Sequence, residues 1–235
     1  MTSSWRRPAL IWDIDGTLIE ARGIGRQALN QAFADVFHVE SAFSELDFAG
    51  ATDYDLFAQA VHHCGLETTS ATPEMFFARY IRRLRQLMTT SAPRPLPGVI
   101  AMTAQLSQAG WRMTLGTGNI RAGAYCKLAA AGIANYFPHG GFSRPGLSRA
   151  AILKDAQGTK GPSGAIVIGD TPRDIEAAHH IGAAVIAVAT GRFSVQDLET
   201  RGADAVLATL EDTNAFKSAV ADIVGRKNLQ TSETF

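Results

Sequence analysis

Five short apolar segments constrain the fold of this chain more than any other feature of its sequence. Each is four to six residues long and rich in Ile, Val, Leu and Ala, which is typical of strands buried on both faces of a sheet. Amphipathic stretches with helical spacing lie between the later segments, so we expect an α/β fold with a doubly wound parallel sheet. The predicted strands are residues 9–12, 113–116, 165–169, 184–189 and 205–208.

The first two predicted strands are separated by about 100 residues, whereas one strand–helix–strand crossover needs roughly 30. Residues 18–92 have helical character and end in a proline-rich connector, which indicates an insertion. We therefore expect an all-helical cap domain within an α/β core. The expected boundaries are 1–18 and 95–235 for the core and 19–94 for the cap, with a frayed tail over 227–235.

Composition excludes several classes of partner. The 235 residues contain 22 Lys and Arg and 22 Asp and Glu, and this balance disfavours electrostatic binding to nucleic acid or to a membrane surface. Two cysteines, Cys64 and Cys126, are too few for a disulfide framework and suit a reducing compartment. No apolar run is long enough for a bilayer span or a signal peptide. We expect a cytoplasmic monomer or weak homodimer that acts on a small molecule.

Acidic and hydroxyl side chains follow three of the predicted strands. Asp13 and Asp15 follow the first, Thr117 the second, and Asp170 and Asp174 the third. The carboxyl ends of parallel strands meet at one edge of a sheet, where ligands of such folds bind. Carboxylates this close repel one another unless a cation neutralises them, and a cluster without His or Cys suits Mg²⁺. The pattern predicts a magnesium-dependent phosphoryl site.

These motifs, in their order and spacing, resemble those of the haloacid dehalogenase superfamily. The first motif, DxDGT, is present at residues 13–17, Thr117 matches the second, and the acidic pair of IGDTPRD matches the fourth. The inserted helices are similar to the first (C1) cap type of the superfamily, so the resemblance covers nearly the whole chain. The third motif is a single basic residue, for which Arg149 is the first candidate and Lys154 the alternative; Lys160 lies in the same interval.

The resemblance implies a Rossmann-like core and a role for each motif. Asp13 would be the nucleophile that forms an aspartyl-phosphate, and Asp15 the general acid and base. Thr117, with the backbone at Gly118 and Asn119, would bind the phosphoryl group, and Arg149 would offset its charge. Mg²⁺ would be bound by the carboxylates of Asp13 and Asp170 and the carbonyl of Asp15, with support from Asp174.

Within the superfamily, the chain most resembles the phosphoglycolate phosphatase group, which implies a Mg²⁺-dependent phosphomonoesterase for a small phosphorylated metabolite. Asp15 disfavours dehalogenation, because those members lack the second acid. Phosphonate hydrolysis of the superfamily's type needs a cap lysine, and the first lysine here is Lys127, beyond the cap. A β-phosphoglucomutase-like phosphomutase and a non-catalytic binding or regulatory protein remain as alternatives.

The cap supplies candidate substrate contacts. Residues 23–28 fit a loose G-x-G-x-x-A dinucleotide pattern, but they follow the first strand too late for that role. We instead expect this segment to form the entry to the cap. Four cap residues are candidate substrate contacts: Glu20, Arg22, Thr52 and Asp53.

Overall fold

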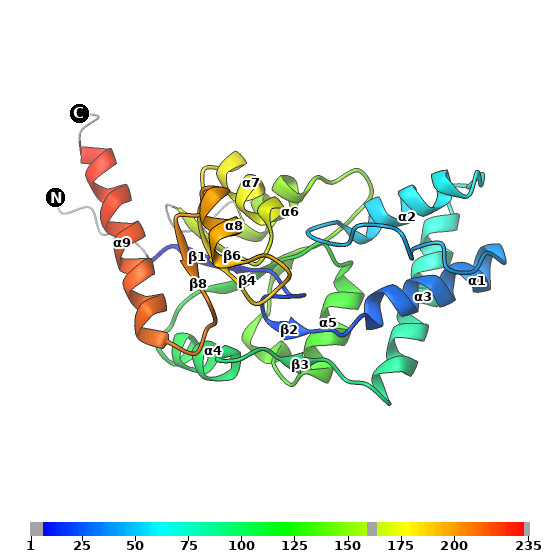
Figure 1. Cartoon of the computed structure of the whole chain (residues 1–235), viewed down its shortest axis with the longest axis horizontal. Coiled ribbons are helices and arrows are strands. Elements are labelled where there is room, and N and C mark those ends of the chain that lie inside the picture. The colour runs from blue at the N-terminus through cyan, green and yellow to red at the C-terminus, as the bar shows by residue number, and fades with distance from the viewer. Residues whose placement is uncertain (1–6, 159–163, 233–235) are drawn as a thin grey trace.

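A β-sheet forms the centre of the molecule (Figure 1). It has six strands, all parallel, in the order β5-β4-β1-β6-β7-β8. The computed structural model describes residues 7–158 and 164–232. Strand β1 lies between β4 and β6, so the three strands that precede the acidic and hydroxyl motifs are neighbours. This arrangement confirms the predicted α/β class. The strands are β1 (Ala9–Trp12), β4 (Met113–Gly116), β5 (Gly140–Gly141), β6 (Ala165–Gly169), β7 (Ala184–Val188) and β8 (Ala205–Leu207).

The predicted strands agree with the observed ones to within a residue. Strands β7 and β8 each end one residue before the predicted end. Strand β5 was not predicted, because its two residues are glycines and carry no hydrophobic pattern.

Helices cover both faces of the sheet because successive strand residues point in opposite directions. Leu10 and Trp12 of β1 pack with one set of helices, and Trp12 stacks on Phe216 with ring centroids 5.8 Å apart. Ala9 and Ile11 pack with the other set. The first set is α4 (Val99–Gln108), α5 (Arg121–Ala130) and α9 (Thr213–Ser232), and the second is α6 (Arg149–Gln157), α7 (Pro172–His180) and α8 (Val195–Thr200).

The inserted segment forms a separate helical layer beside the sheet (Figure 1). Its helices are α1 (Ile24–Phe37), α2 (Asp53–His63) and α3 (Thr72–Met88). They surround an aromatic core in which Phe76 packs between Phe33 and Phe57, with centroid distances of 6.0 and 4.6 Å. This layer has its own hydrophobic cluster, distinct from the two that flank the sheet.

A two-stranded antiparallel connection joins the cap to the core. Strand β2 (Ile19–Glu20) pairs with β3 (Arg94–Pro95), and the expected boundaries at 18/19 and 94/95 fall at this connection. At the other end of the chain, α9 continues to Ser232 through much of the expected tail, and residues 233–235 lie outside the described residues. None of the helices within the described ranges has the length and apolar character that crossing a bilayer requires.

Candidate active site

The chain turns sharply where it leaves β1, and this turn places Asp13 and Asp15. The Asp13 backbone N–H donates to the carbonyl of Ile168 at 2.9 Å, which continues the ladder between β1 and β6. Gly16 then adopts a φ of 87°, a conformation that is readily available only to glycine. A Cβ at Gly16 would lie 2.3 Å from Oδ2 of Asp170. The glycine is therefore needed both for the turn and for the approach of Asp170.

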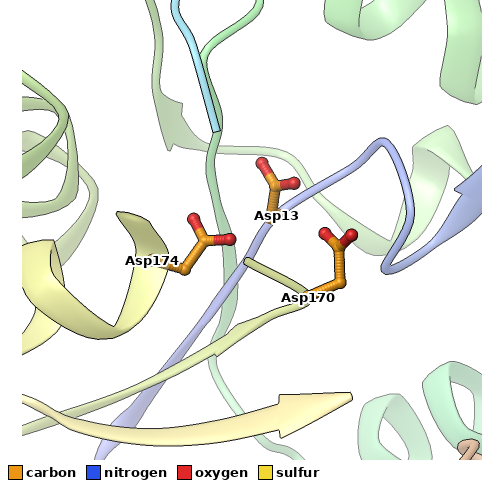
Figure 2. Close-up of side chains that lie close together, drawn as sticks. All are labelled: Asp13, Asp170 and Asp174. Atoms are coloured by element: carbon orange, nitrogen blue, oxygen red, sulfur yellow. The ribbon is translucent and has the colours of Figure 1, made fainter. Parts of the chain in front are cut away.

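Three carboxylates from separate elements meet at the end of the sheet (Figure 2). Asp13 follows β1, Asp170 follows β6, and Asp174 lies in the first turn of α7; one oxygen of each lies within 4.8 Å of the others. All three residues are buried. Burial raises the pKa of Asp13 to about 6, with Arg149 opposing the shift, and burial also raises the pKa of Asp170 well above its ordinary value. The pocket therefore favours an additional positive charge.

Arg149, the first residue of α6, supplies one positive charge to this cluster. Its Nη2 donates to Oδ1 of Asp13 at 2.7 Å, and its Nε donates to Oδ1 of Asp174 at 3.1 Å. Burial opposes the charged form of Arg149, but the carboxylates of Asp174 and Asp13 outweigh this effect and raise its pKa. One guanidinium against three carboxylates leaves an excess of negative charge. This donor set of buried oxygens fits a hard divalent cation.

Asp174 is held on both sides. Its Oδ1 accepts from Arg149, while its Oδ2 accepts from the backbone N–H and the hydroxyl of Thr171 at 3.2 and 2.7 Å. The contact with the backbone N–H of Thr171, together with the backbone N–H of Asp174 that donates to the hydroxyl of Thr171 at 3.3 Å, forms a capping box at the start of α7. Asp174 therefore orients Arg149 and caps a helix at the same time.

The other side of the site is built on the loop after β4. The side-chain amide of Asn119 donates to the hydroxyl of Thr117 at 2.8 Å and to Oδ2 of Asp15 at 2.7 Å. Lys127 of α5 donates to the same Oδ2 of Asp15 at 2.6 Å and to Oδ1 of Asn119 at 2.7 Å. Asp13 and Asp15 therefore have different cations, Arg149 and Lys127 respectively.

A cavity of about 400 Å³ opens between the sheet edge and the cap, a size typical of small-molecule sites. Both domains contribute to its wall. The predicted site residues that line it are Asp13, Asp15, Thr117, Gly118, Asn119, Arg149, Asp170 and Asp53, whereas Asp174 lies behind Arg149.

The candidate substrate contacts from the cap divide into two groups. Asp53 lines the cavity, and its Oδ2 accepts from the backbone N–H of Ile120 at 2.7 Å. Burial raises the pKa of Asp53 to about 6, although Lys127 opposes the shift. Thr52 instead caps α2 by accepting from the N–H of Asp55. Glu20 and Arg22 do not reach the cavity, because they pair with each other at side-chain exposures of 53% and 46%.

Of the candidates for the third motif, only Arg149 lies beside the acidic cluster. Lys154 is exposed on α6 and does not line the cavity, and Lys160 lies outside the described residues. Lys127 was not among the predicted site residues. Its signal in the sequence is a position on α5 between Ala124 and Leu128, on the face that is otherwise apolar and buried.

The fold and the cavity are those of an α/β enzyme, with carboxylates, guanidinium groups and one lysine around a pocket that a helical cap covers. The chain belongs to the family described as haloacid dehalogenase-like hydrolase, whose sequence profile matches residues 10–188. This match confirms the assignment made from the motifs.

Comparison with individual proteins agrees with this family. The chain is 27% identical to a phosphoglycolate phosphatase of Mesorhizobium japonicum over 205 residues, covering 79% of this chain and 84% of that protein. It is 26% identical to a phosphoglycolate phosphatase of Synechococcus elongatus, covering 87% and 94%. Among solved structures, CbbY from Rhodobacter sphaeroides in complex with phosphate aligns with a TM-score of 0.68 at 20% identity, covering 88% of this chain and 96% of that chain. The β-phosphoglucomutase of Clostridium difficile aligns with a TM-score of 0.69 at 15% identity, covering 93% and 99%.

Proposed function

We propose that the protein is a Mg²⁺-dependent phosphomonoesterase that hydrolyses a small phosphorylated metabolite through an aspartyl-phosphate on Asp13. The observation that carries the proposal is the position of Asp13 and Asp15 in one cavity, each with its own cation. The phosphoglycolate phosphatases among its relatives support the same reaction class and make 2-phosphoglycolate the first substrate to test.

In the first half of the reaction, a carboxylate oxygen of Asp13 attacks the phosphorus and the bond to the leaving oxygen breaks. Asp15 donates a proton to that leaving oxygen. Arg149 favours the ionised form of Asp13 against the effect of burial. The hydroxyl of Thr117, the backbone near Gly118 and the guanidinium of Arg149 bind the phosphoryl oxygens.

In the second half, Asp15 takes a proton from a water molecule that attacks the phosphorus of the aspartyl-phosphate. The bond between phosphorus and Asp13 breaks, and phosphate leaves. The cap limits the access of bulk water and contacts the leaving group; Asp53 is the cap carboxylate in the cavity wall.

The carboxylates of Asp13 and Asp170 and the carbonyl of Asp15 would bind Mg²⁺, with Asp174 in support. When bound, the ion would offset the charge of the carboxylates and of the phosphoryl oxygens. Burial raises the pKa of Asp13 and of Asp170, and neighbouring carboxylates add to both shifts, so a bound cation would favour the ionised forms of these groups.

The test is phosphate release from p-nitrophenyl phosphate and from a panel of phosphate esters that includes 2-phosphoglycolate, with and without Mg²⁺. Asp13→Asn should lower kcat by at least about 1000-fold, because it removes the nucleophile. Full activity of the Asp13→Asn variant would refute the assignment of Asp13. Rapid transfer of phosphate to a sugar phosphate, with slow hydrolysis, would favour a phosphomutase instead.

A further inference from the structure

Lys127 is a buried lysine in a place where an apolar residue would fit. It is 4% exposed, and its neighbours on the inner face of α5, Ala124 and Leu128, are fully buried. Burying an ammonium group is costly unless it is paired and hydrogen-bonded. The partners of Lys127 therefore indicate what the charge is for.

Those partners form a closed hydrogen-bonded ring. Lys127 donates to Oδ2 of Asp15 and to Oδ1 of Asn119, and Asn119 donates to Oδ2 of Asp15. Asn119 also donates to the hydroxyl of Thr117, so the ring is fixed to the end of β4. The Nζ group lies close to the entry of the cap as well, 3.5 Å from where a Cβ of Gly25 would be. Lys127 is thus held between core and cap with its ammonium directed at Asp15.

The two carboxylate oxygens of Asp15 differ in their hydrogen bonds. Oδ2 accepts two hydrogen bonds, one of them from a cation. Oδ1 is buried and has no hydrogen-bond partner within the described part of the chain. A buried carboxylate oxygen without a partner is unusual in a folded protein. Asp15 is therefore held through Oδ2, while its side chain as a whole stays 36% exposed and lines the cavity.

We propose that Lys127 is a positioning residue for the phosphatase reaction: with Asn119 it holds Oδ2 of Asp15 and so fixes the orientation of the carboxyl group that acts on the leaving oxygen. The inference rests on the proposed function. A proton on the carboxyl group of Asp15 passes to the ester oxygen as the bond from that oxygen to phosphorus breaks, and the carboxylate later takes a proton from the attacking water. Lys127 itself transfers no proton.

Stabilisation of the fold does not account for this arrangement. Buried ion pairs often contribute little to stability compared with apolar residues of similar size, and the side chain of Asp15 retains 36% exposure. A carboxylate with that access to solvent does not need a buried lysine for its solvation. The lysine instead restricts the rotation of a carboxylate that must meet one substrate atom.

The test compares two esters that differ in leaving group. An alkyl phosphate needs a proton on its leaving oxygen, whereas p-nitrophenolate leaves with little assistance. Lys127→Met should lower kcat/KM for the alkyl phosphate by about 100-fold, within the range typical of general acid catalysis. It should change kcat/KM for p-nitrophenyl phosphate by less than about 3-fold. The matched control is Lys154→Met, at an exposed lysine outside the cavity, which should leave both values unchanged.

A double-variant cycle separates positioning from a loss of packing. In an Asp15→Asn background, Lys127→Met should have no further effect on the alkyl phosphate, because residues that act through one another are not additive. Equal losses on both esters, no loss on either, or additive losses in the double variant would each overturn the proposal. Absence of Mg²⁺-dependent turnover by the wild-type chain would refute the proposed function itself, and the role of Lys127 with it.

Discussion

Nη2 of Arg149 lies 2.7 Å from Oδ1 of Asp13, and this ion pair is almost completely enclosed, with side-chain exposures of 9% and 10%. The same guanidinium also pairs with the fully buried carboxylate of Asp174. One cation therefore stabilises two carboxylates from different elements. Removing it would leave both of them buried without a counter-charge.

Arg149→Met is expected to lower the free energy of unfolding of the metal-free protein by about 3 to 5 kcal/mol, the usual cost of breaking a buried ion pair. Urea denaturation in the presence of a chelator measures this. The control is Arg144→Met, because Arg144 pairs with Asp155 on the exposed surface, where such pairs contribute less than about 1 kcal/mol. Equal losses in the free energy of unfolding for the two variants would show that the buried ion pair of Arg149 stabilises the fold no more than an exposed one.

Mg²⁺ should raise the melting temperature of the wild-type protein, since a ligand that binds only the folded state stabilises it by mass action. Asp170→Asn should abolish that shift and the turnover of phosphate esters together, because it removes a carboxylate from the cluster. Differential scanning fluorimetry over a Mg²⁺ series gives the answer. Asp222→Asn, at an exposed position on α9, should respond to Mg²⁺ as the wild type does; a full response by Asp170→Asn would contradict the assignment.

Ionisation of Asp53 should contribute to the pH dependence of the free energy of unfolding. Burial raises the pKa of Asp53 to about 6 in the folded protein, above the ordinary value of 3.8. The folded state therefore binds more protons between these values, and stability falls as the pH rises from about 4 to about 6.

Asp53→Asn should remove the loss of stability that ionisation of Asp53 causes as the pH rises. Above pH 6 the metal-free variant should be more stable than the wild type by about 2 to 3 kcal/mol, and the difference should vanish below about pH 4. Denaturation curves across this range measure it, with Asp55→Asn, at an exposed position in the same helical turn, as the matched control. A constant difference at all pH values would show that the substitution acts through packing.

Close contact between core and cap should make Gly118 intolerant of a side chain. A Cβ at Gly118 would lie 2.2 Å from the carbonyl oxygen of Ala51, and the carbonyl of Gly118 accepts from the N–H of Asp53 at 2.7 Å. Gly118→Ala should displace the cap segment, cost about 1 to 3 kcal/mol in stability and reduce turnover. Thermal unfolding and phosphate release measure the two effects. Gly225→Ala, on α9 with open space around it, should instead be neutral or stabilising by up to about 1 kcal/mol.

The acidic cluster could be predicted because its members follow strands with an unmistakable apolar pattern. Asp13 and Asp170 come directly after β1 and β6, and parallel topology brings such positions to one edge. The position of Arg149 could be predicted from the sequence because this residue begins a helix that Ser148 caps. The expected cap boundaries, and the roles given to these side chains, remain predictions.

The remaining differences have physical causes that a single sequence does not show. Glu20 and Arg22 are adjacent to the cap entry, but they pair with each other at the surface, and side-chain direction there is not set by any periodic pattern. Lys127 carries a visible signal, a charge on an apolar helix face, but its meaning depends on Asp15 and Asn119, which reach it only in the folded chain.

The central place of β1 has a consequence for the order in which the molecule assembles. Leu10 pairs with Met113 and Ile11 with Val167. Strand β1 therefore cannot pair on both sides until more than half of the chain has folded against it. Pairings between residues distant in sequence form slowly, because the entropy cost of closing a long loop comes before the stabilisation from the contacts. The cap, with its own aromatic cluster within residues 24–88, depends on contacts much nearer in sequence. We therefore expect the cap to become structured early and Asp13, the proposed nucleophile, to reach its final position among the last events of folding.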